Sequence, residues 1–245
     1  MKPQRAGCLS IAGADDNYEE PTNGNTPLCA AAVIARQDSL VRDQLIAGAS
    51  PNTRTTHQRT PLHGAAELGL EKIVSAMLGT PSTDKDVLDN RGYSPLMLAY
   101  SSDHLDTVKA LSHAGADLSI RDPDDNYSVL DMAANGGTVS DVAALLDFGA
   151  DVNTAGGSWS TLHGAAFFDQ ADCVRVLLDA GADLERKDIL GETALHFGAR
   201  QGSDAALALL RWGADPNQRT SDGSTALTLQ PVGITATWTT LLVCF

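Results

Sequence analysis

Basic residues, aromatic residues and long apolar runs are scarce in this chain of 245 residues. Its 17 Lys and Arg stand against 31 Asp and Glu, which leaves a net charge of −14. Because nucleic-acid affinity depends largely on neutralising phosphates, this balance argues against DNA, RNA and anionic membranes as main partners. It favours solubility and partner proteins with basic patches. The longest apolar stretch, residues 241–245, is far short of the ~20 residues that a membrane-spanning helix needs.

Cysteines are also few. Cys8, Cys29, Cys173 and Cys244 lie far apart and include no Cys-x-x-Cys pair, so the sequence predicts neither a metal site nor a disulfide framework. We expect free thiols, as in a reducing compartment. Residues 1–12 contain no apolar run of the kind found in a signal peptide. The expected location is the cytoplasm, with the nucleus as the alternative.

What the chain does contain is a repeated segment. Ser160-Thr161-Leu162-His163-Gly164-Ala165-Ala166 has related copies along most of the sequence. These copies begin 32 to 34 residues apart, at Thr26, Thr60, Ser94, Ser128, Ser160, Thr193 and Thr225. A fixed period in this range is the signature of a repeat array.

Each copy predicts two antiparallel helices. The hydroxyl residue that begins a copy suits a helix N-cap, and a proline follows it at the first helical position in three copies, as Pro27, Pro61 and Pro95. Small pairs such as Ala165-Ala166 let a second helix pack closely, and apolar residues at helical spacing predict that helix. A Gly-Ala-Asp segment such as 181–183 ends it, with Gly in a left-handed conformation. Asn126 replaces the turn glycine of the fourth copy, since Asn tolerates positive φ.

This pattern resembles the ankyrin repeat, with its Thr-Pro-Leu-His-like start and its Gly-Ala-Asp-like end. The resemblance covers roughly Gly13 to Leu229. It implies an all-α fold, an α-solenoid of stacked ankyrin helix-turn-helix repeats joined by β-hairpin-like loops. Such an array buries its core between neighbouring repeats.

Three segments are expected. Residues 1–22 form an N-terminal segment with the remnant of a truncated repeat, residues 23–229 form about six full repeats and a degenerate seventh, and residues 230–245 form an atypical tail. The first segment is either a makeshift cap or part of a longer array. In the seventh repeat Gln230-Pro231 replace the small pair, which predicts one helical turn and then an irregular tail; a truncated or frameshifted C-terminus is the alternative. One extra residue between Thr26 and Gly48 should be absorbed around residues 36–38.

The sequence offers no catalytic set. His63, His163 and His196 recur at one repeat position, and the resemblance implies that each bonds to the neighbouring Thr or Ser and to backbone. The acidic turn at 122–126 lacks the remaining ligands of a Ca²⁺ loop, and no phosphate-binding glycine loop followed by Lys is present. We therefore expect no enzyme activity, no cofactor and no metal.

The resemblance implies that three sets of positions face the groove of the array, namely the residues that flank the turn glycine, the residue before each cap and the two residues after each small pair. Aromatic residues concentrate there, although the chain has only 3 Trp, 4 Tyr and 5 Phe. The predicted partner-binding residues are Tyr93, Tyr127, Trp159, Phe167, Phe168 and Arg200. Trp, Tyr and Arg are favoured in interface hot spots. The alternative is that Phe167 or Phe168 packs between repeats.

The resulting hypothesis is a monomeric, non-catalytic scaffold that binds a partner polypeptide in the concave groove. The alternative is the recognition arm of a larger regulator, such as a ubiquitin-ligase adaptor or an immune-type receptor. The resemblance also implies that Asn153 and Asn217 are candidates for asparaginyl hydroxylation. Each follows an Asp by two residues and a Leu by eight.

Overall fold

A computed structural model describes residues 26–156 and 159–229 of the chain. It divides into two compact units, Met1–Asp125 and Asn126–Phe245, which are described separately here. The predicted segments 1–22 and 230–245 lie outside the described residues, so the boundaries of the array stay predictions.

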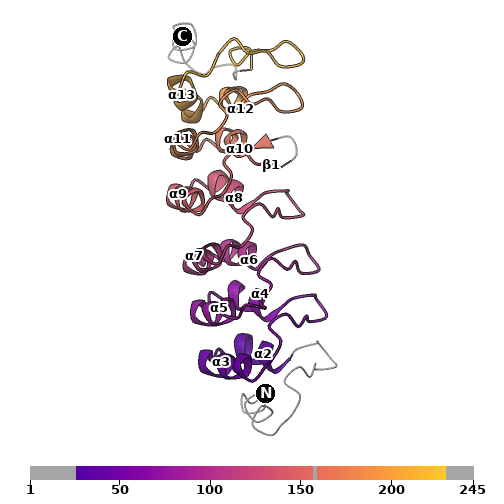
Figure 1. The fold of residues 1–245 in the computed structure, drawn as a ribbon. Coiled ribbons are helices and arrows are strands. Elements are labelled where there is room, and N and C mark those ends of the chain that lie inside the picture. Colours follow the sequence, from indigo (N-terminus) through magenta and orange to yellow (C-terminus); the bar gives the residue numbers. More distant parts are fainter. Residues whose placement is uncertain (1–25, 157–158, 230–245) are drawn as a thin grey trace. The chain divides into compact units, whose positions relative to one another are not determined.

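The first unit stacks three helical pairs. The first helix of the first pair is divided into α2 (Pro27–Cys29) and the π-helix η1 (Ala30–Ala35), and α3 (Asp38–Ile46) is its partner. The next pairs are α4 (Pro61–Glu67) with α5 (Glu71–Leu78), and α6 (Pro95–Ser101) with α7 (Leu105–His113). First helices pack on first helices and second on second, and the connecting loops project from one side of the unit (Figure 1).

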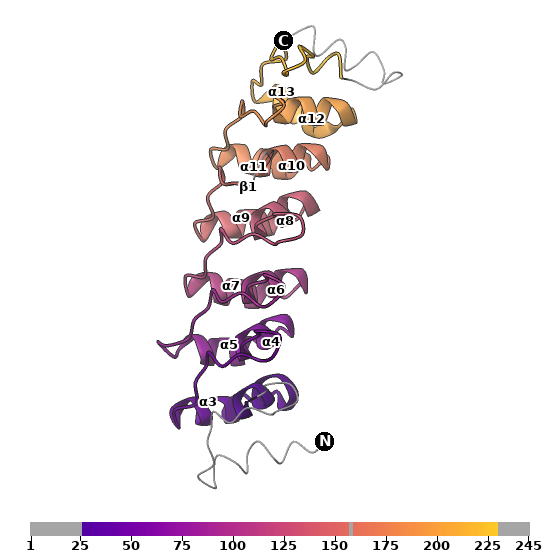
Figure 2. The same cartoon turned by 90° about the vertical axis from the view of Figure 1, so that its right-hand side faces the viewer.

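The second unit repeats this plan. Its pairs are α8 (Val129–Gly136) with α9 (Val139–Asp147), α10 (Thr161–Phe167) with α11 (Ala171–Asp179), and α12 (Ala194–Gln201) with α13 (Asp204–Arg211), and within each unit the pairs are stacked in register (Figure 2). Strands β1 (Ala155–Gly156) and β2 (Trp159–Ser160) pair antiparallel, with Gly156 opposite Trp159. A single turn follows Thr225, as predicted. The predicted all-α solenoid of helical pairs and hairpin-like loops is confirmed.

The helix boundaries follow from the local sequence as predicted. The hydroxyl residues Thr26, Thr60, Ser94, Ser128, Ser160 and Thr193 are all N-caps with extended backbone. Asn126 has a φ of 60°, as expected for its substitution of glycine. The closing glycines of the second helices are left-handed too, with φ between 75° and 98°: Gly48, Gly115, Gly149, Gly181 and Gly213.

The extra residue of the first repeat lies slightly earlier than predicted. It is absorbed within the first helix itself, where Ala30–Ala35 forms a π-helix that ends at Arg36 with a φ of 52°. The prediction placed it at 36–38. A π-helical turn accommodates one more residue than an α-turn over the same length of axis, and such turns recur at functional sites.

The core runs along the stack through equivalent positions. The leucine of each first helix is at most 2% exposed, as Leu28, Leu62, Leu96, Leu130, Leu162 and Leu195. Four residues before the position of the closing glycine, which Pro81 occupies in the second repeat, the second helices bury Met77, Leu111, Leu145, Leu177 and Leu209. In α3 that position holds Gln44, which is fully buried and whose amide has no hydrogen-bond partner at either end among the described residues. A buried amide without partners destabilises the fold.

We predict that Gln44→Leu raises the free energy of unfolding by about 1–3 kcal/mol, because it removes an unsatisfied buried amide and restores the apolar residue of the other repeats. Urea denaturation followed by circular dichroism measures the change. The matched control is Leu177→Gln, which should lower stability at the equivalent position of α11. An unchanged or lowered stability of Gln44→Leu would contradict this account of the first repeat.

Candidate functional site

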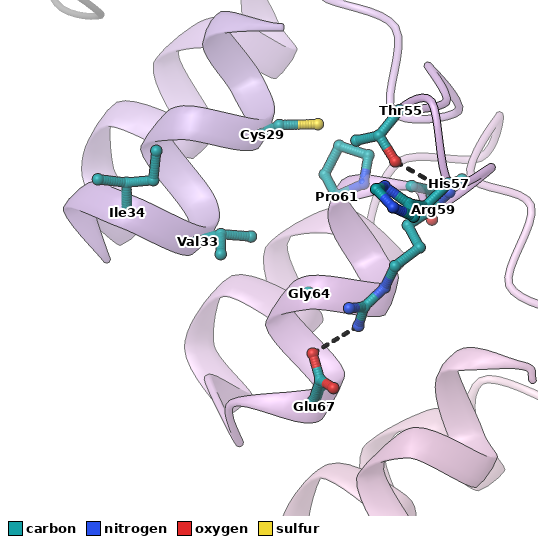
Figure 3. Close-up of a pocket in the computed structure, with 10 residues that line it drawn as sticks. Cys29, Val33, Ile34, Thr55, His57, Arg59, Pro61, Gly64 and Glu67 are labelled. Carbon is teal, nitrogen blue, oxygen red and sulfur yellow. Dashed lines mark hydrogen bonds and ion pairs between the residues drawn. The ribbon is translucent and has the colours of Figure 1, made fainter. Parts of the chain in front are cut away.

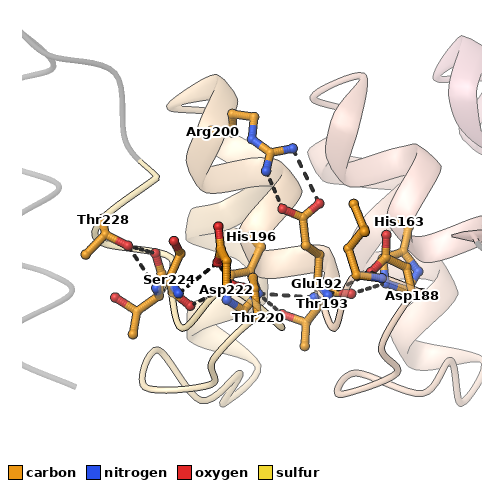
Figure 4. Close-up of polar contacts among 12 residues, drawn as sticks. His163, Asp188, Glu192, Thr193, His196, Arg200, Thr220, Asp222, Ser224 and Thr228 are labelled. Carbon is orange, nitrogen blue, oxygen red and sulfur yellow. Dashed lines mark hydrogen bonds and ion pairs between the residues drawn. The ribbon is translucent and has the colours of Figure 1, made fainter.

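In four of the six described first helices, the third residue joins its own N-cap to the next repeat. In α4, the backbone N–H of Thr60 donates to Nδ1 of His63 over 3.1 Å. Nε2 of His63 lies 3.2 Å from the carbonyl oxygen of Tyr93, in the loop of the next repeat. The same contacts recur for His163 with Ser160 and Glu192 (Figure 4) and for His196 with Thr193 and Gln218. The structural role predicted for the three histidines is confirmed.

These contacts determine the protonation of the rings. Because Nδ1 accepts a hydrogen bond from a backbone N–H, the ring proton of His63 resides on Nε2 and is donated to the Tyr93 carbonyl. Burial lowers the pKa of His63 from 6.5 to about 4, although the hydrogen bond to Tyr93 opposes this shift. Burial lowers the pKa of His163 and of His196 as well. The three rings are therefore neutral at physiological pH.

Asp131 takes the place of the histidine in α8. Its Oδ2 accepts hydrogen bonds from the backbone N–H and the hydroxyl of Ser128, at 2.9 and 2.8 Å. A carboxylate cannot donate to a backbone carbonyl. Its Oδ1 instead accepts a 2.6 Å hydrogen bond from the hydroxyl of Thr161, at the first position of α10. The link between repeats is thus conserved in position while its chemistry changes.

The carboxylates of the loops also accept hydrogen bonds that hold the structure together. Asp188 accepts hydrogen bonds from the backbone N–H groups of Leu190 and Glu192, at 2.8 and 2.7 Å (Figure 4). The hydroxyl of Thr220 and the backbone N–H of Ser224 lower the pKa of Asp222 to about 2. No group of His, Cys, Asp or Glu able to hold a metal ion occurs in residues 26–156 and 159–229.

An aromatic cluster forms on the groove side of the second unit. It consists of Trp159, Phe167, Phe168 and Phe197. The ring of Trp159 lies 5.3 Å from that of Phe167 and 4.5 Å, edge to face, from that of Phe197, while Phe167 contacts Phe168 at 5.0 Å. Phe197 is 2% exposed but Phe168 is 44% exposed. The cluster therefore has a buried base and an open edge.

Sequence reasoning missed Phe197, which supports the cluster from α12. It follows His196, at a position that holds glycine in the two His-Gly-Ala-Ala motifs. The large side chain at this usually small position was the available signal. Arg200 lies beside it, with its guanidinium carbon 5.9 Å from the Phe197 ring, and is ion-paired with the buried Glu192.

The predicted groove positions also prove to be paired. The residue before a cap contacts the residue eight positions later, in the last turn of the first helix, and we call these two residues a tip pair. Three tip pairs have direct contacts: Arg59 with Glu67 at 2.5 Å, Trp159 with Phe167, and Glu192 with Arg200. The two ionic pairs have opposite order, since the loop residue is basic in one and acidic in the other.

The structure brings four of the six predicted partner-binding residues together, namely Trp159, Phe167, Phe168 and Arg200. Tyr93 belongs to the first unit, where its hydroxyl donates to Asp124 over 2.7 Å and Arg91 lies 4.9 Å above its ring. That hydrogen bond raises the pKa of Tyr93. Tyr127 is half-buried directly before the cap of α8.

The two candidate asparagines differ in their contacts. The side-chain amide of Asn153 donates to the Gly181 carbonyl over 3.0 Å and accepts from the Asp183 N–H over 2.8 Å. It therefore joins two successive loops. Asn217 is exposed, and its side chain has no hydrogen-bond partner in the described part of the chain.

Stacked helical pairs, with connecting loops that project from one side of each unit, define a helical repeat protein. A family model described as ankyrin repeats in three copies matches residues 28–122 and 130–220, which is most of the chain. The chain belongs to the ankyrin repeat family, as its motifs predicted. Repeats of this kind are in general non-catalytic modules of protein–protein interaction.

Two curated relatives are much longer than the region they share with this chain. The phosphate system positive regulatory protein PHO81 of Saccharomyces cerevisiae is 30% identical over 189 residues, and SH3 and multiple ankyrin repeat domains protein 2 of Homo sapiens is 28% identical over 183 residues. The matches cover 68% and 74% of this chain but 14% and 10% of those proteins.

A solved structure supports the fold. The human ASB11 ankyrin repeat domain covers 89% of this chain and is itself covered to 97%, with a TM-score of 0.70 and 24% identity. Within the described residues, no helix has the length and apolar character needed to cross a membrane.

The buried histidines predict a specific loss of stability in acid. Unfolded histidine binds a proton near pH 6.5, whereas folded His63 does so only near pH 4. The unfolded state therefore binds more protons between these values. His63 contributes stability that is present above pH 6.5 and is lost as the pH falls toward 4, by up to ~1.4 kcal/mol per pH unit. Urea denaturation at pH 7, 6 and 5 measures this slope.

Replacement of the His63 imidazole tests whether this residue causes the loss of stability in acid. His63→Gln should be less stable at pH 7 but should show a shallower loss of stability on acidification than the unmodified protein. His57→Gln, at an exposed ring, is the control and should leave the slope unchanged. Equal slopes for His63→Gln and the unmodified protein would refute the assignment.

Proposed function

We propose that this protein is a non-catalytic scaffold that binds a partner polypeptide on the groove side of its second unit. The binding site consists of the aromatic cluster together with Arg200. The observation that carries the proposal is the exposed edge of the cluster, Phe168, which is 44% exposed on top of rings that are packed against each other. Exposed apolar surface beside fixed aromatic rings is typical of binding sites.

The charge of the second unit favours a partner with a basic patch. Residues 126–229 contain 14 Asp and Glu but 6 Lys and Arg. Arg200 is ion-paired with Glu192, so its positive charge is already balanced within the site. An apolar side chain flanked by Lys or Arg would match this surface, since complementary charge accelerates association and selects partners.

The alternative function is that of a recognition arm in a larger regulator. It is favoured by the relatives, in which the matched array makes up 14% and 10% of the protein. Both functions require the same binding surface. In the recognition arm, a further domain of the same polypeptide acts on the bound partner. In the scaffold, no such domain is required.

Substitution of Phe168 tests the binding site. A photo-reactive phenylalanine analogue at position 168 should crosslink a polypeptide from extracts of the source cells, and Phe168→Ala should weaken binding of that polypeptide by about tenfold or more. The matched control is Trp212, which is 45% exposed at the end of α13. The analogue at position 212 should capture no such partner, and Trp212→Ala should leave its affinity unchanged.

The outcome that contradicts the site is clear. Crosslinking that is equal at 168 and 212, or full affinity in a Phe168→Ala variant with an unchanged circular dichroism spectrum, would remove the aromatic cluster as the binding site.

We also propose that hydroxylation, if it occurs, takes place at Asn217 in preference to Asn153. The Asn153 amide is engaged by the next loop, whereas that of Asn217 is exposed. Incubation with an asparaginyl hydroxylase, 2-oxoglutarate, Fe(II) and O₂, followed by peptide mass spectrometry, should show one oxygen atom from O₂ added to the Asn217 peptide first, while 2-oxoglutarate is oxidised to succinate and CO₂. Faster modification of Asn153, or none at Asn217, would contradict this order.

A further inference from the structure

We propose that the first unit contains a second docking site, for an acidic polypeptide segment that carries a branched aliphatic side chain. The site is a pocket between the first helices of the first two repeats, next to the loop that precedes α4. It is independent of the aromatic cluster and selects for the opposite charge.

The pocket has a volume of about 250 Å³ and an apolar wall on each side. Val33 and Ile34 of η1 form one wall and Pro61 of α4 forms the other, while Arg59 and Glu67 border the pocket along α4 (Figure 3). Its size suits an aliphatic side chain and part of the adjoining backbone, as expected for a peptide site with a single anchor.

Two successive side chains of η1 form the apolar wall and have different environments. Val33 is fixed against the next repeat, because a Cβ atom on Gly64 would lie only 2.4 Å from its Cγ2 atom. The next residue, Ile34, is 67% exposed. One aliphatic side chain is thus packed against the neighbouring helix, and the following one stays at the surface, where it lines the pocket.

The charge of the loop beside the pocket indicates that the bound segment is acidic. The loop at 51–60 contains Arg54, His57 and Arg59 and no carboxylate, and Ser50 stands where Asp ends most other repeats. Every other described loop between two repeats carries at least one carboxylate, among them Asp89, Asp122, Asp151, Asp188 and Asp222. In a chain of net charge −14, an acidic segment is repelled from those loops and tolerated at this one.

Arg59 can receive a second carboxylate. One of its terminal nitrogens donates to Glu67 and its backbone N–H donates to the Thr55 hydroxyl, while the side chain as a whole is 29% exposed. A guanidinium has five N–H donors, so the ion pair with Glu67 leaves donors for an acidic ligand. The ion pair also holds the side chain along α4, which reduces the entropy lost on binding.

Two short peptides test the proposal on the full chain. The probes are acetyl-Asp-Leu-Asp-Leu-Asp-amide and its counterpart with Lys in place of each Asp. Methyl-labelled Ile and Val are followed by NMR during titration. The acidic peptide should shift the Val33 and Ile34 methyl signals with an affinity about fivefold or more above that of the basic peptide. The exposed methyl groups of Ile189 in the second unit should not move with it.

The chain itself supplies the control variant. Exchange of the ion pair, Arg59→Glu with Glu67→Arg, reproduces the order seen in Glu192 and Arg200, so the pair and the fold are kept. This exchange should abolish the preference for the acidic peptide, and Ile34→Ser should weaken its binding. Phe168→Ala should leave it unchanged, which separates this site from the aromatic cluster.

Three results would overturn the proposal. They are equal affinity for the two peptides, a preference that survives the exchange of Arg59 and Glu67, and shifts at Ile189 as large as those at Ile34. Failure of the aromatic cluster to bind a partner would have no bearing on these results.

Discussion

The interaction on which the array depends is the hydrogen bond from the third residue of a first helix to the next repeat. No helical pair here can bury its own apolar face, so each requires its neighbour. His63, His163 and His196 accept from their own caps and donate to the next loop. Asp131 also links its repeat to the next one, but it accepts the hydrogen bond, from the hydroxyl of Thr161. The histidine links hold a loop in place relative to the helix that precedes it, whereas the Asp131 link joins α8 to the first residue of α10.

Fixed loops also orient the side chains at the tips of the repeats. His63 and His163 bond to the carbonyl of the residue before the next cap, Tyr93 and Glu192, whereas His196 bonds to Gln218 in the loop before Thr225. The position before a cap is also where a tip pair begins. Glu192 combines both roles, since its carbonyl accepts from His163 while its carboxylate binds Arg200 (Figure 4). The variable side chains of the groove are thereby held before a partner arrives, which lowers the entropy lost on binding. The two ionic tip pairs differ in whether the loop residue is basic, as Arg59 is, or acidic, as Glu192 is, and this difference distinguishes one repeat from another.

Local features of this fold were predictable because they depend on local chemistry. The caps, the left-handed Gly181 and Asn126, and the buried leucines follow from residue type and period alone. The aromatic cluster was predicted only in part, since Phe197 comes from the next repeat and its contact with Trp159 depends on how repeats stack. The π-helix illustrates another limit: the length between Thr26 and Gly48 reveals an extra residue, but whether a helix or a loop absorbs it depends on packing. The buried Gln44 breaks the apolar pattern with no compensating partner.

The histidine link is also the most directly measurable part of this account. Two-dimensional NMR that correlates imidazole nitrogens with ring protons reports which nitrogen carries the proton. The structure predicts that His63, His163 and His196 are neutral at pH 7, with a protonated Nε2 and a bare Nδ1. The exposed His57 supplies the reference signal in the same spectrum. A proton on Nδ1, or a charged ring at any of the three positions, would contradict the proposed link between repeats.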